Sequence, residues 1–261
     1  MPQSLGSDRA WRDEASGQLA AARLWRQVVL EVLESLPLGE KPWRILEAAG
    51  GPAWLGMELA AGGHRLTIAE AAQGMLDAVQ QEAGRRGLAE PVELVRDDIG
   101  DLRSLADDRF DLVLAPAGGL GYCADAWRGL AALYRVARRG GMLFAEVENR
   151  FSGARSARRG RGWTELSTML QTGWAPLPGE PDRNVRMFAP AELRGLLQEV
   201  GWRVIYVWGG NVLQSLLGAE VLESAARHQD QWAEMLQLER WLRTCRDLTG
   251  AGLGVQVLAC K

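Results

Sequence analysis

Between residues 44 and 147 of the 261-residue chain, short apolar runs alternate with longer segments of helical periodicity. Strands are expected at 44–48, 65–69, 91–95, 110–115 and 140–147, with helices at 54–62, 72–86 and 125–138. A further helix (190–201) and two strands (202–208 and 254–260) follow. Strands separated by helices of about 10–15 residues form βαβ units, which build a parallel sheet with right-handed crossovers. The sequence therefore predicts an α/β fold with a doubly wound, mostly parallel sheet of about seven strands.

The regions outside this alternation suggest an arm and two insertions. Residues 8–36 carry apolar side chains at helical spacing, whereas 149–188 lose the alternation and are rich in Arg, Pro and Gly. We expect a helical N-terminal arm or lid (1–40), an α/β core (41–148), an insertion or cap (149–189) and a C-terminal part of the core (190–261), within which 211–250 form a helical insertion.

Composition excludes several classes of protein. The chain has 33 acidic and 30 basic residues, so its net charge of −3 gives no general reason to expect a nucleic-acid partner. No apolar run approaches the roughly 18–20 residues of a membrane span, and the N-terminal segment has no signal-peptide pattern. Three cysteines without a CxxC pair argue for a reducing cytoplasm and against a disulfide framework or a zinc site. Only two histidines are present, which excludes His-rich metal sites, so we expect no metal site. The lack of an apolar span leads us to expect no membrane partner.

A glycine-bearing turn, AGGPA (49–53), follows the first expected strand, and acids stand at three consecutive strand ends. They are Glu47, Glu70 and the pair Asp97 and Asp98. Ligands of open α/β sheets bind at this edge, where a turn without Cβ atoms exposes backbone N–H groups. The turn lacks GxGxxG, and a carboxylate beside it would repel a pyrophosphate. A ligand with hydroxyls, an amine and a positive centre fits better, with Glu70 accepting ribose hydroxyls and Asp98 an adenine amine.

RILEAAGGPAWLGMELAAGGHRLTIAEAAQGML resembles the first two motifs of class I S-adenosylmethionine-dependent methyltransferases. VELVRDDIGDL resembles the third motif, FDLVLAPAGGLGY the fourth strand, and LYRVARRGGMLFAEVENRF the following helix, Gly-Gly turn and fifth strand. FAPAELRGLLQEVGWRVIYVW is similar to the late helix and sixth strand, so the resemblance covers 44–208 and the closing strand 254–260. It implies a Rossmann-like sheet with an antiparallel last strand, S-adenosyl-L-methionine as cofactor and S-adenosyl-L-homocysteine as product.

The same resemblance assigns roles to individual residues. It implies that the first acid orients the turn and the methionine amine, that the second binds ribose, and that later residues surround the adenine and the methyl end. The implied cofactor-binding residues are Glu47, Ala49, Gly50, Gly51, Glu70, Ala71, Met75, Asp98, Ile99, Ala115 and Pro116. Ala49 and Ala53 stand where the family prefers glycine. An alanine there is compatible with negative φ and costly at positive φ, so weakened cofactor binding remains open.

Methyl transfer to a small-molecule acceptor, such as one of specialised metabolism, is the activity that the resemblance implies. Tyr122, after the fourth strand, is the candidate catalytic residue, and the candidate acceptor-binding residues are Tyr122, Glu148, Asn149, Arg150, Trp11 and Trp163. Two alternatives stay open. One is a cofactor-fold protein without methyl transfer, cyclase-like or binding-only. The other is an RNA or protein methyltransferase that uses the basic run Arg150–Arg161. Acceptor, methylated atom and oligomeric state, monomer or homodimer, are also left open.

Overall fold

A computed structural model of the protein describes residues 20–40, 42–88, 92–116, 118–152, 162–177 and 180–261. The chain divides into two compact units. The core unit comprises Pro37–Val147, Ala191–Tyr206 and Val257–Lys261. The accessory unit comprises the described residues up to Leu36 together with Glu148–Pro190 and Val207–Gln256. The expected domain boundaries at 40/41, 148/149 and 189/190 stay predictions.

Helices and strands make up most of the described residues of both units. The strands are β1 (Arg44–Ala48), β2 (Arg65–Glu70), β3 (Val92–Arg96), β4 (Phe110–Ala115), β5 (Ala137–Glu148), β6 (Trp174–Leu177), β7 (Glu180–Arg186), β8 (Arg203–Gly210) and β9 (Gly254–Cys260). The helices are α2 (Ala20–Glu34), α3 (Trp54–Ala61), α4 (Gln73–Arg85), α5 (Ala126–Val136), α7 (Trp163–Thr172), α8 (Pro190–Val200), α9 (Val212–Leu217), α10 (Ala219–Ala225) and α11 (Gln229–Thr244). Two short 3₁₀ helices are η1 (Gly119–Tyr122) and η2 (Arg246–Leu248).

Seven of these strands form one sheet in the order β3-β2-β1-β4-β5-β9-β8. The pairs β1–β2, β1–β4, β2–β3 and β4–β5 are parallel. β9 runs against β5, because the Gly140 N–H donates to the Lys261 carbonyl and the Lys261 N–H to the Gly141 carbonyl. The predicted doubly wound, mostly parallel sheet is confirmed. Its strand order reverses between β1 and β4, which is the point where such sheets bind their ligands.

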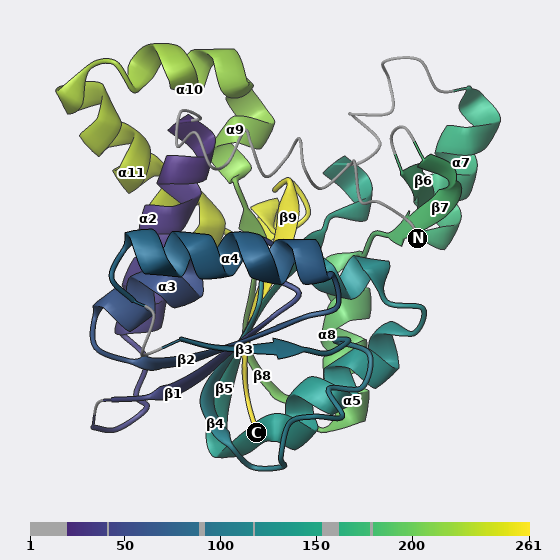
Figure 1. The fold of residues 1–261 in the computed structure, drawn as a ribbon. Helices are drawn as coiled ribbons and strands as arrows, with labels where there is room; N and C mark the ends of the chain where they lie inside the picture. The colour runs from purple at the N-terminus through teal and green to yellow at the C-terminus, as the bar shows by residue number, and fades with distance from the viewer. Residues whose placement is uncertain (1–19, 41, 89–91, 117, 153–161, 178–179) are drawn as a thin grey trace. The chain divides into compact units, whose positions relative to one another are not determined.

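Both faces of the central strands are covered, which explains their continuous apolar runs. Ile45, Leu46, Leu112 and Val113 have no exposed surface. Helices α3 and α4 cover one face of the sheet in the core unit, and α5 and α8 cover the other (Figure 1). Strand β4 begins and ends at the residues that the apolar run FDLVLA predicted.

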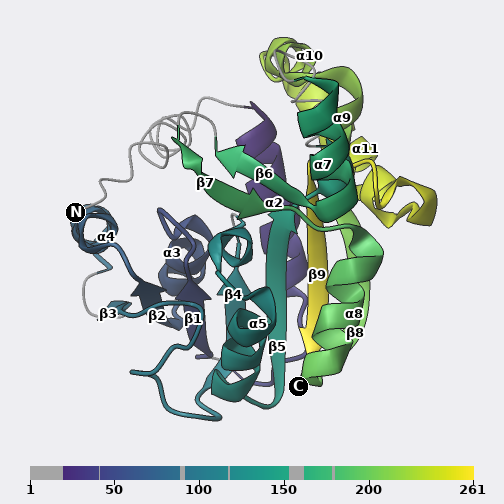
Figure 2. The same cartoon turned by 90° about the vertical axis from the view of Figure 1, so that its right-hand side faces the viewer.

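The accessory unit adds detail to two expectations. The helical insertion expected over 211–250 is divided into α9, α10 and α11, because Gly218 has a φ of +89° at the junction of α9 and α10 and the chain turns again before α11. For residues 149–188 the sequence indicated only a loss of the strand–helix alternation. Their described part contains helix α7 and the antiparallel pair β6–β7, which forms a two-stranded sheet of its own (Figure 2).

A buried cluster of apolar residues from α2, α9, α10 and α11 forms the helical core of the accessory unit. Glu239 is buried beside it and accepts the N–H groups of Val212 and Leu213, so it caps the N-terminus of α9. Arg243 is also buried and donates to the Gln256 side chain. Among the described residues, no helix has the length and apolarity to cross a membrane.

Candidate functional site

The turn between β1 and α3 has an unusual backbone conformation. Ala49 and Ala53 have φ angles of 49° and 53°, and Gly51 has a φ of 60°. Both alanines therefore occupy the left-handed region, which costs an L-residue about 1–2 kcal/mol relative to glycine. The two alanines thus keep the backbone of a glycine turn and carry its strain, and a weakening of cofactor binding by them stays a prediction.

The carboxylate of Glu47 lies against this turn and is almost fully buried, with 1% of the side chain exposed. Its Oε2 accepts the Gly56 N–H at 2.6 Å, whereas its Oε1 has no hydrogen-bond partner in the structure. A Cβ on Gly50 would lie 2.7 Å from Glu47 Cγ, and one on Gly56 would lie 2.6 Å from Oε2. Glycine is required at both positions because the buried carboxylate fills the space. Burial raises the pKa of Glu47 to about 8.

Two further acids lie close together at the ends of β2 and β3. Glu70 accepts the Ala72 N–H at 3.1 Å, at the start of α4. Burial raises the pKa of Glu70, and the nearby charge of Asp98 adds to the increase. Asp98 Oδ1 accepts the Gly100 N–H at 2.7 Å. Ile99 is buried, and its carbonyl lies beside Gly129 of α5. The structure thus brings Glu70 and Asp98 to one place.

The end of β4 completes this edge of the core unit. Ala115 is fully buried, and η1 begins four residues later at Gly119. A Cβ on Gly119 would lie 2.7 Å from the Ala49 carbonyl oxygen and 2.8 Å from Ala49 Cβ, so the turn after β1 packs directly on η1. Tyr122 ends η1 with 54% of its surface exposed. Its predicted catalytic and acceptor-binding roles are not tested by this placement and stay predictions.

The other candidate acceptor-binding residues belong to the accessory unit or lie outside the described residues. Glu148 is exposed, yet the surrounding protein raises its pKa by desolvation. Asn149 is fully buried, and its side-chain amide donates to the carbonyls of Gly250 and Gly252. The Arg150 guanidinium lies against Gly173, and Trp163 is 85% exposed. Trp11 lies outside the described residues, as does most of the basic run up to Arg161. These assignments also stay predictions.

His64 has a structural environment. It is buried, stacks on Trp43 with ring centroids 4.5 Å apart, and accepts the Trp43 N–H at Nδ1. Within the described part of the chain, no group of three or more His, Cys, Asp or Glu side chains is placed to hold a metal ion. The sequence interpretation did not single out Gly56 and Gly119, because only the packing against Glu47 and Ala49 explains why they are glycines.

The core-unit site fits a cationic ligand that is rich in hydrogen-bond donors. Glu47 and Glu70 both have raised pKa values, and Glu47 Oε1 is a buried acceptor without a donor. An ammonium, a sulfonium or ribose hydroxyls would supply the missing charge and donors. A Rossmann-like sheet with such acids at consecutive strand ends defines a nucleoside-cofactor enzyme of the class I methyltransferase type.

Comparison with known proteins agrees with this class. Residues 45–141 match the family described as "Methyltransferase domain". The chain is 25% identical to the tRNA 5-carboxymethoxyuridine methyltransferase of Escherichia coli K12, over 88% of this chain and 82% of that protein. It is 29% identical to a demethylmenaquinone methyltransferase of Bacteroides fragilis, over 54% of this chain and 50% of that protein. The matched domain and these relatives indicate an S-adenosylmethionine-dependent methyltransferase with S-adenosylmethionine as its cofactor, and the sheet has the class I methyltransferase fold.

The fold alone does not determine the reaction. The crystal structure of the [4+2]-cyclase SpnF is similar to this chain with a TM-score of 0.59 and 16% identity, covering 89% of this chain and 80% of that one. At such identity the likeness concerns the fold only. Support for the activity comes from the matched family and the two relatives named above. They favour methyl transfer over the cyclase-like and binding-only alternatives.

Replacing Ala49 by glycine should stabilise the protein. The substitution relieves the left-handed strain at the cost of a half-buried methyl group and a more flexible unfolded chain, so we expect a gain of about 0.5–1 kcal/mol in the free energy of unfolding. Denaturant unfolding measures the change. Ala78→Gly, in the interior of α4 and half-buried like Ala49, is the control and should lose about 1 kcal/mol. A loss of stability in Ala49→Gly would contradict the strain at this position.

Proposed function

We propose that the core unit holds S-adenosylmethionine with Glu47, Glu70 and Asp98 and that the methyl group goes to a small-molecule acceptor. The observation that carries the cofactor assignment is the buried, partnerless Oε1 of Glu47 beside the glycine turn. Glu70 has one oxygen on the Ala72 N–H, and it would accept ribose hydroxyls. Asp98, near Glu70 and anchored through the Gly100 N–H, would accept the adenine amine.

The remaining candidate residues would complete the cofactor site through backbone and apolar contacts. The turn residues Ala49, Gly50 and Gly51 would lie along the methionine part and the ribose, since Gly51 carries no Cβ and no atom lies within 4 Å of the place that a Cβ would take. Ala71 and Met75, at the start of α4, and Ile99 would border the adenine. Ala115 and Pro116, at the end of β4, would face the methyl end.

Methyl transfer requires little of the protein beyond aligning the acceptor with the methyl group. When bound, S-adenosylmethionine supplies an electrophilic methyl group on a sulfonium. The protein's side chains would hold the acceptor in line with that methyl group and exclude water. An acceptor that is already a nucleophile, such as an ionised acid or an amine, needs no general base. This agrees with the placement of His64, whose Nδ1 is taken up by the Trp43 backbone. Tyr122, exposed at the end of η1, is our candidate for contact with the acceptor.

Removing the Glu70 side chain should weaken cofactor binding. Glu70→Ala would leave the ribose hydroxyls without a charged acceptor and cost about 1.5–3 kcal/mol, which is roughly a ten- to hundredfold higher dissociation constant for S-adenosylhomocysteine. Isothermal titration calorimetry measures it. Glu199→Ala removes the same charge from the exposed side of α8 and should leave the affinity unchanged. Equal affinities in wild type and Glu70→Ala would remove the ribose assignment.

A second candidate acceptor is RNA, because the E. coli relative that matches 88% of this chain is a tRNA methyltransferase. The small-molecule proposal is supported by the net charge of −3, since RNA binding generally needs a basic field, and by the B. fragilis relative. Incubating a cell extract with the enzyme and cofactor labelled on the methyl group separates the two. Label in a low-molecular-mass product that chromatography separates from the unreacted cofactor supports a small acceptor. Label that precipitates with RNA and becomes soluble after ribonuclease treatment contradicts it and supports the second candidate.

A further inference from the structure

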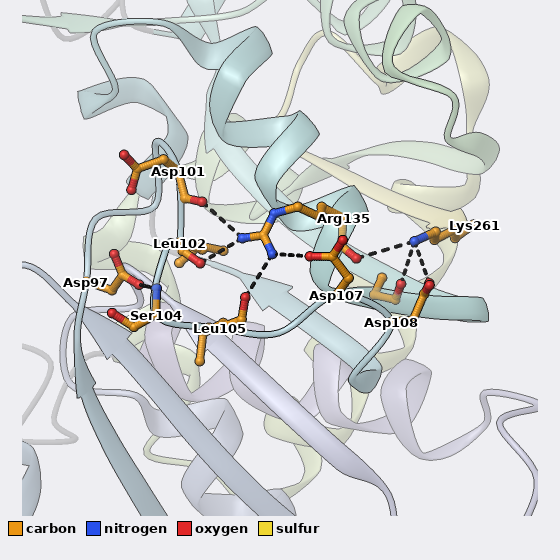
Figure 3. A network of polar contacts seen from close by, with 10 residues as sticks. Asp97, Asp101, Leu102, Ser104, Leu105, Asp107, Asp108, Arg135 and Lys261 are labelled. Atoms are coloured by element: carbon orange, nitrogen blue, oxygen red, sulfur yellow. Dashed lines mark hydrogen bonds and ion pairs between the residues drawn. The ribbon is translucent and has the colours of Figure 1, made fainter.

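A single arginine holds the segment that follows β3. Arg135, in the last turn of α5, donates through Nη2 to the carbonyls of Asp101 (3.1 Å) and Leu102 (2.7 Å). Its Nη1 donates to the Leu105 carbonyl at 2.8 Å and to Asp107 Oδ1. Figure 3 shows the guanidinium facing all four groups. An exposed ion pair would involve only Arg135 and Asp107. The three further bonds to backbone carbonyls show that Arg135 also holds the backbone of residues 101–105.

This contact is linked directly to Asp98. The Leu102 N–H donates to the Asp98 carbonyl at 2.8 Å, and the Leu102 carbonyl is the acceptor that Arg135 reaches at 2.7 Å. Leu102 therefore bonds to both residues: its N–H donates to the Asp98 carbonyl, and its carbonyl accepts from the Arg135 guanidinium. The same segment is braced by Asp97, whose Oδ2 accepts the Ser104 N–H. The position of the Asp98 backbone thus depends on where Arg135 holds Leu102.

The segment that Arg135 holds has a strained backbone. Leu102 has a φ of 46°, a strained conformation for a branched aliphatic residue, and it is fully buried. Its carbonyl accepts both the Leu105 N–H at 3.1 Å and Nη2 of Arg135, so the guanidinium braces a turn that also has its own backbone hydrogen bond. The two terminal nitrogens of the planar guanidinium donate to four acceptors spread over residues 101–107, in fixed directions that the single ammonium of a lysine does not match.

We propose that Arg135 is a positioning residue for the adenine side of the cofactor site: by clamping the carbonyls of residues 101, 102 and 105 it sets the place of the Asp98 carboxylate. The inference rests on the proposed role of Asp98 as acceptor of the adenine amine. Arg135 acts through the backbone of Leu102 and touches no cofactor atom in this scheme. Its effect is on recognition of the base rather than on the methyl end.

The test compares two ligands that differ at the adenine amine. S-adenosylhomocysteine carries the amine, and S-inosylhomocysteine carries a carbonyl in its place. The readout is the ratio of their dissociation constants, measured by calorimetry, and this ratio does not depend on the fraction of folded protein. In the wild type the carboxylate of Asp98 should favour the adenosyl ligand. In Arg135→Lys and Arg135→Met we expect this preference to fall about three- to tenfold, as the loss of one or two hydrogen bonds predicts.

Lys261→Met is the matched control. Lys261 belongs to the same network (Figure 3), but it donates to Asp108 Oδ1 and to the carbonyls of Arg135 and Ala137. It contacts none of the carbonyls of residues 101–105 in the structure, so its variant should keep the wild-type ratio. A merely structural role for Arg135 would lower the melting temperature in Arg135→Lys and leave the ratio at the wild-type value, and that result would overturn the proposal.

The variant Asp98→Asn distinguishes the proposed role of Arg135 from the proposed role of Asp98, on which it rests. Asp98→Asn can keep the Gly100 N–H on its amide oxygen and present an amide N–H₂ to the base, so it should reverse the preference toward the inosyl ligand. A wild-type ratio in Asp98→Asn would show that Asp98 does not read the amine, and the proposed cofactor site would fail. A reversed ratio in Asp98→Asn with an unchanged ratio in both Arg135 variants would refute the role of Arg135 alone.

Discussion

At pH 8, Glu47→Gln should be more stable than the wild-type protein, and the difference should shrink as the pH falls toward 5. The reason is the buried carboxyl of Glu47, whose pKa is raised to about 8 from an ordinary 4.5. Glutamine keeps the shape of the side chain and an oxygen for the Gly56 N–H, but it never ionises. We expect the free energy of unfolding, measured with denaturant, to differ between the two proteins by several kcal/mol at pH 8.

The sign follows from proton uptake on folding. Between pH 4.5 and about 8 the Glu47 carboxyl is ionised in the unfolded chain and protonated in the folded protein, so the folded state binds one more proton. The wild type should therefore lose about 1.4 kcal/mol of stability for each pH unit of increase in this window, relative to Glu47→Gln. Below about pH 4.5 both states are protonated at this position and the difference becomes constant.

Other titrating groups are common to both proteins and cancel in the difference. Glu199→Gln makes the same chemical change at an exposed position of α8 and is the matched control: the slope with pH expected for Glu47→Gln should not appear in it. If the curve for Glu47→Gln ran parallel to the wild-type curve from pH 5 to pH 8, the carboxyl of Glu47 would ionise in the folded protein as it does in water. The electrostatic argument for a cationic ligand would then lose its main support.

The strands of the parallel sheet could be predicted from the sequence because burial on both faces leaves a strong signal. FDLVLA is apolar over nearly its whole length and is bounded by polar residues, so β4 could be placed to the residue. The acids Glu47 and Glu70 could be placed at strand ends for the same reason, since each closes an apolar run. Register then follows, as Glu47 pairs with Ile68 and Leu114 in the neighbouring strands.

What the sequence could not give is the environment of these groups. Gly50 and Gly56 are glycines for lack of space beside Glu47, which is a fact of packing between residues three and nine positions apart that no periodicity indicates. In the sequence Arg135 is one more basic residue at the end of an amphipathic helix. Three of its acceptors are backbone carbonyls about 30 residues away, which carry no sequence signature. Similarly, Asn149 follows β5 as a candidate ligand would, yet its amide bonds to Gly250 and Gly252.

The close packing of Glu47 and Gly50 also predicts a strong coupling between the two positions. Gly50→Ala in the wild type forces a methyl group to within 3 Å of Glu47 Cγ and Cδ, so we expect it to lower the free energy of unfolding by about 1–3 kcal/mol or more. The Glu47→Ala background removes the three atoms that lie nearest to this methyl, which are Oε1, Cγ and Cδ of Glu47. There Gly50→Ala should cost nothing and gain up to about 1 kcal/mol, because alanine restricts the unfolded chain.

A double-mutant cycle measured by urea unfolding expresses this as a coupling energy of at least about 1 kcal/mol between the two positions. Gly74→Ala is the control, since Gly74 lies within α4 with no atom within 4 Å of the place its Cβ would take. It should stabilise the wild type and the Glu47→Ala protein by the same amount, about 0.5–1 kcal/mol. Additive effects of Gly50→Ala and Glu47→Ala would mean that the carboxylate does not fill the space beside the turn. Gly50 would then need another explanation, such as close approach of the cofactor itself.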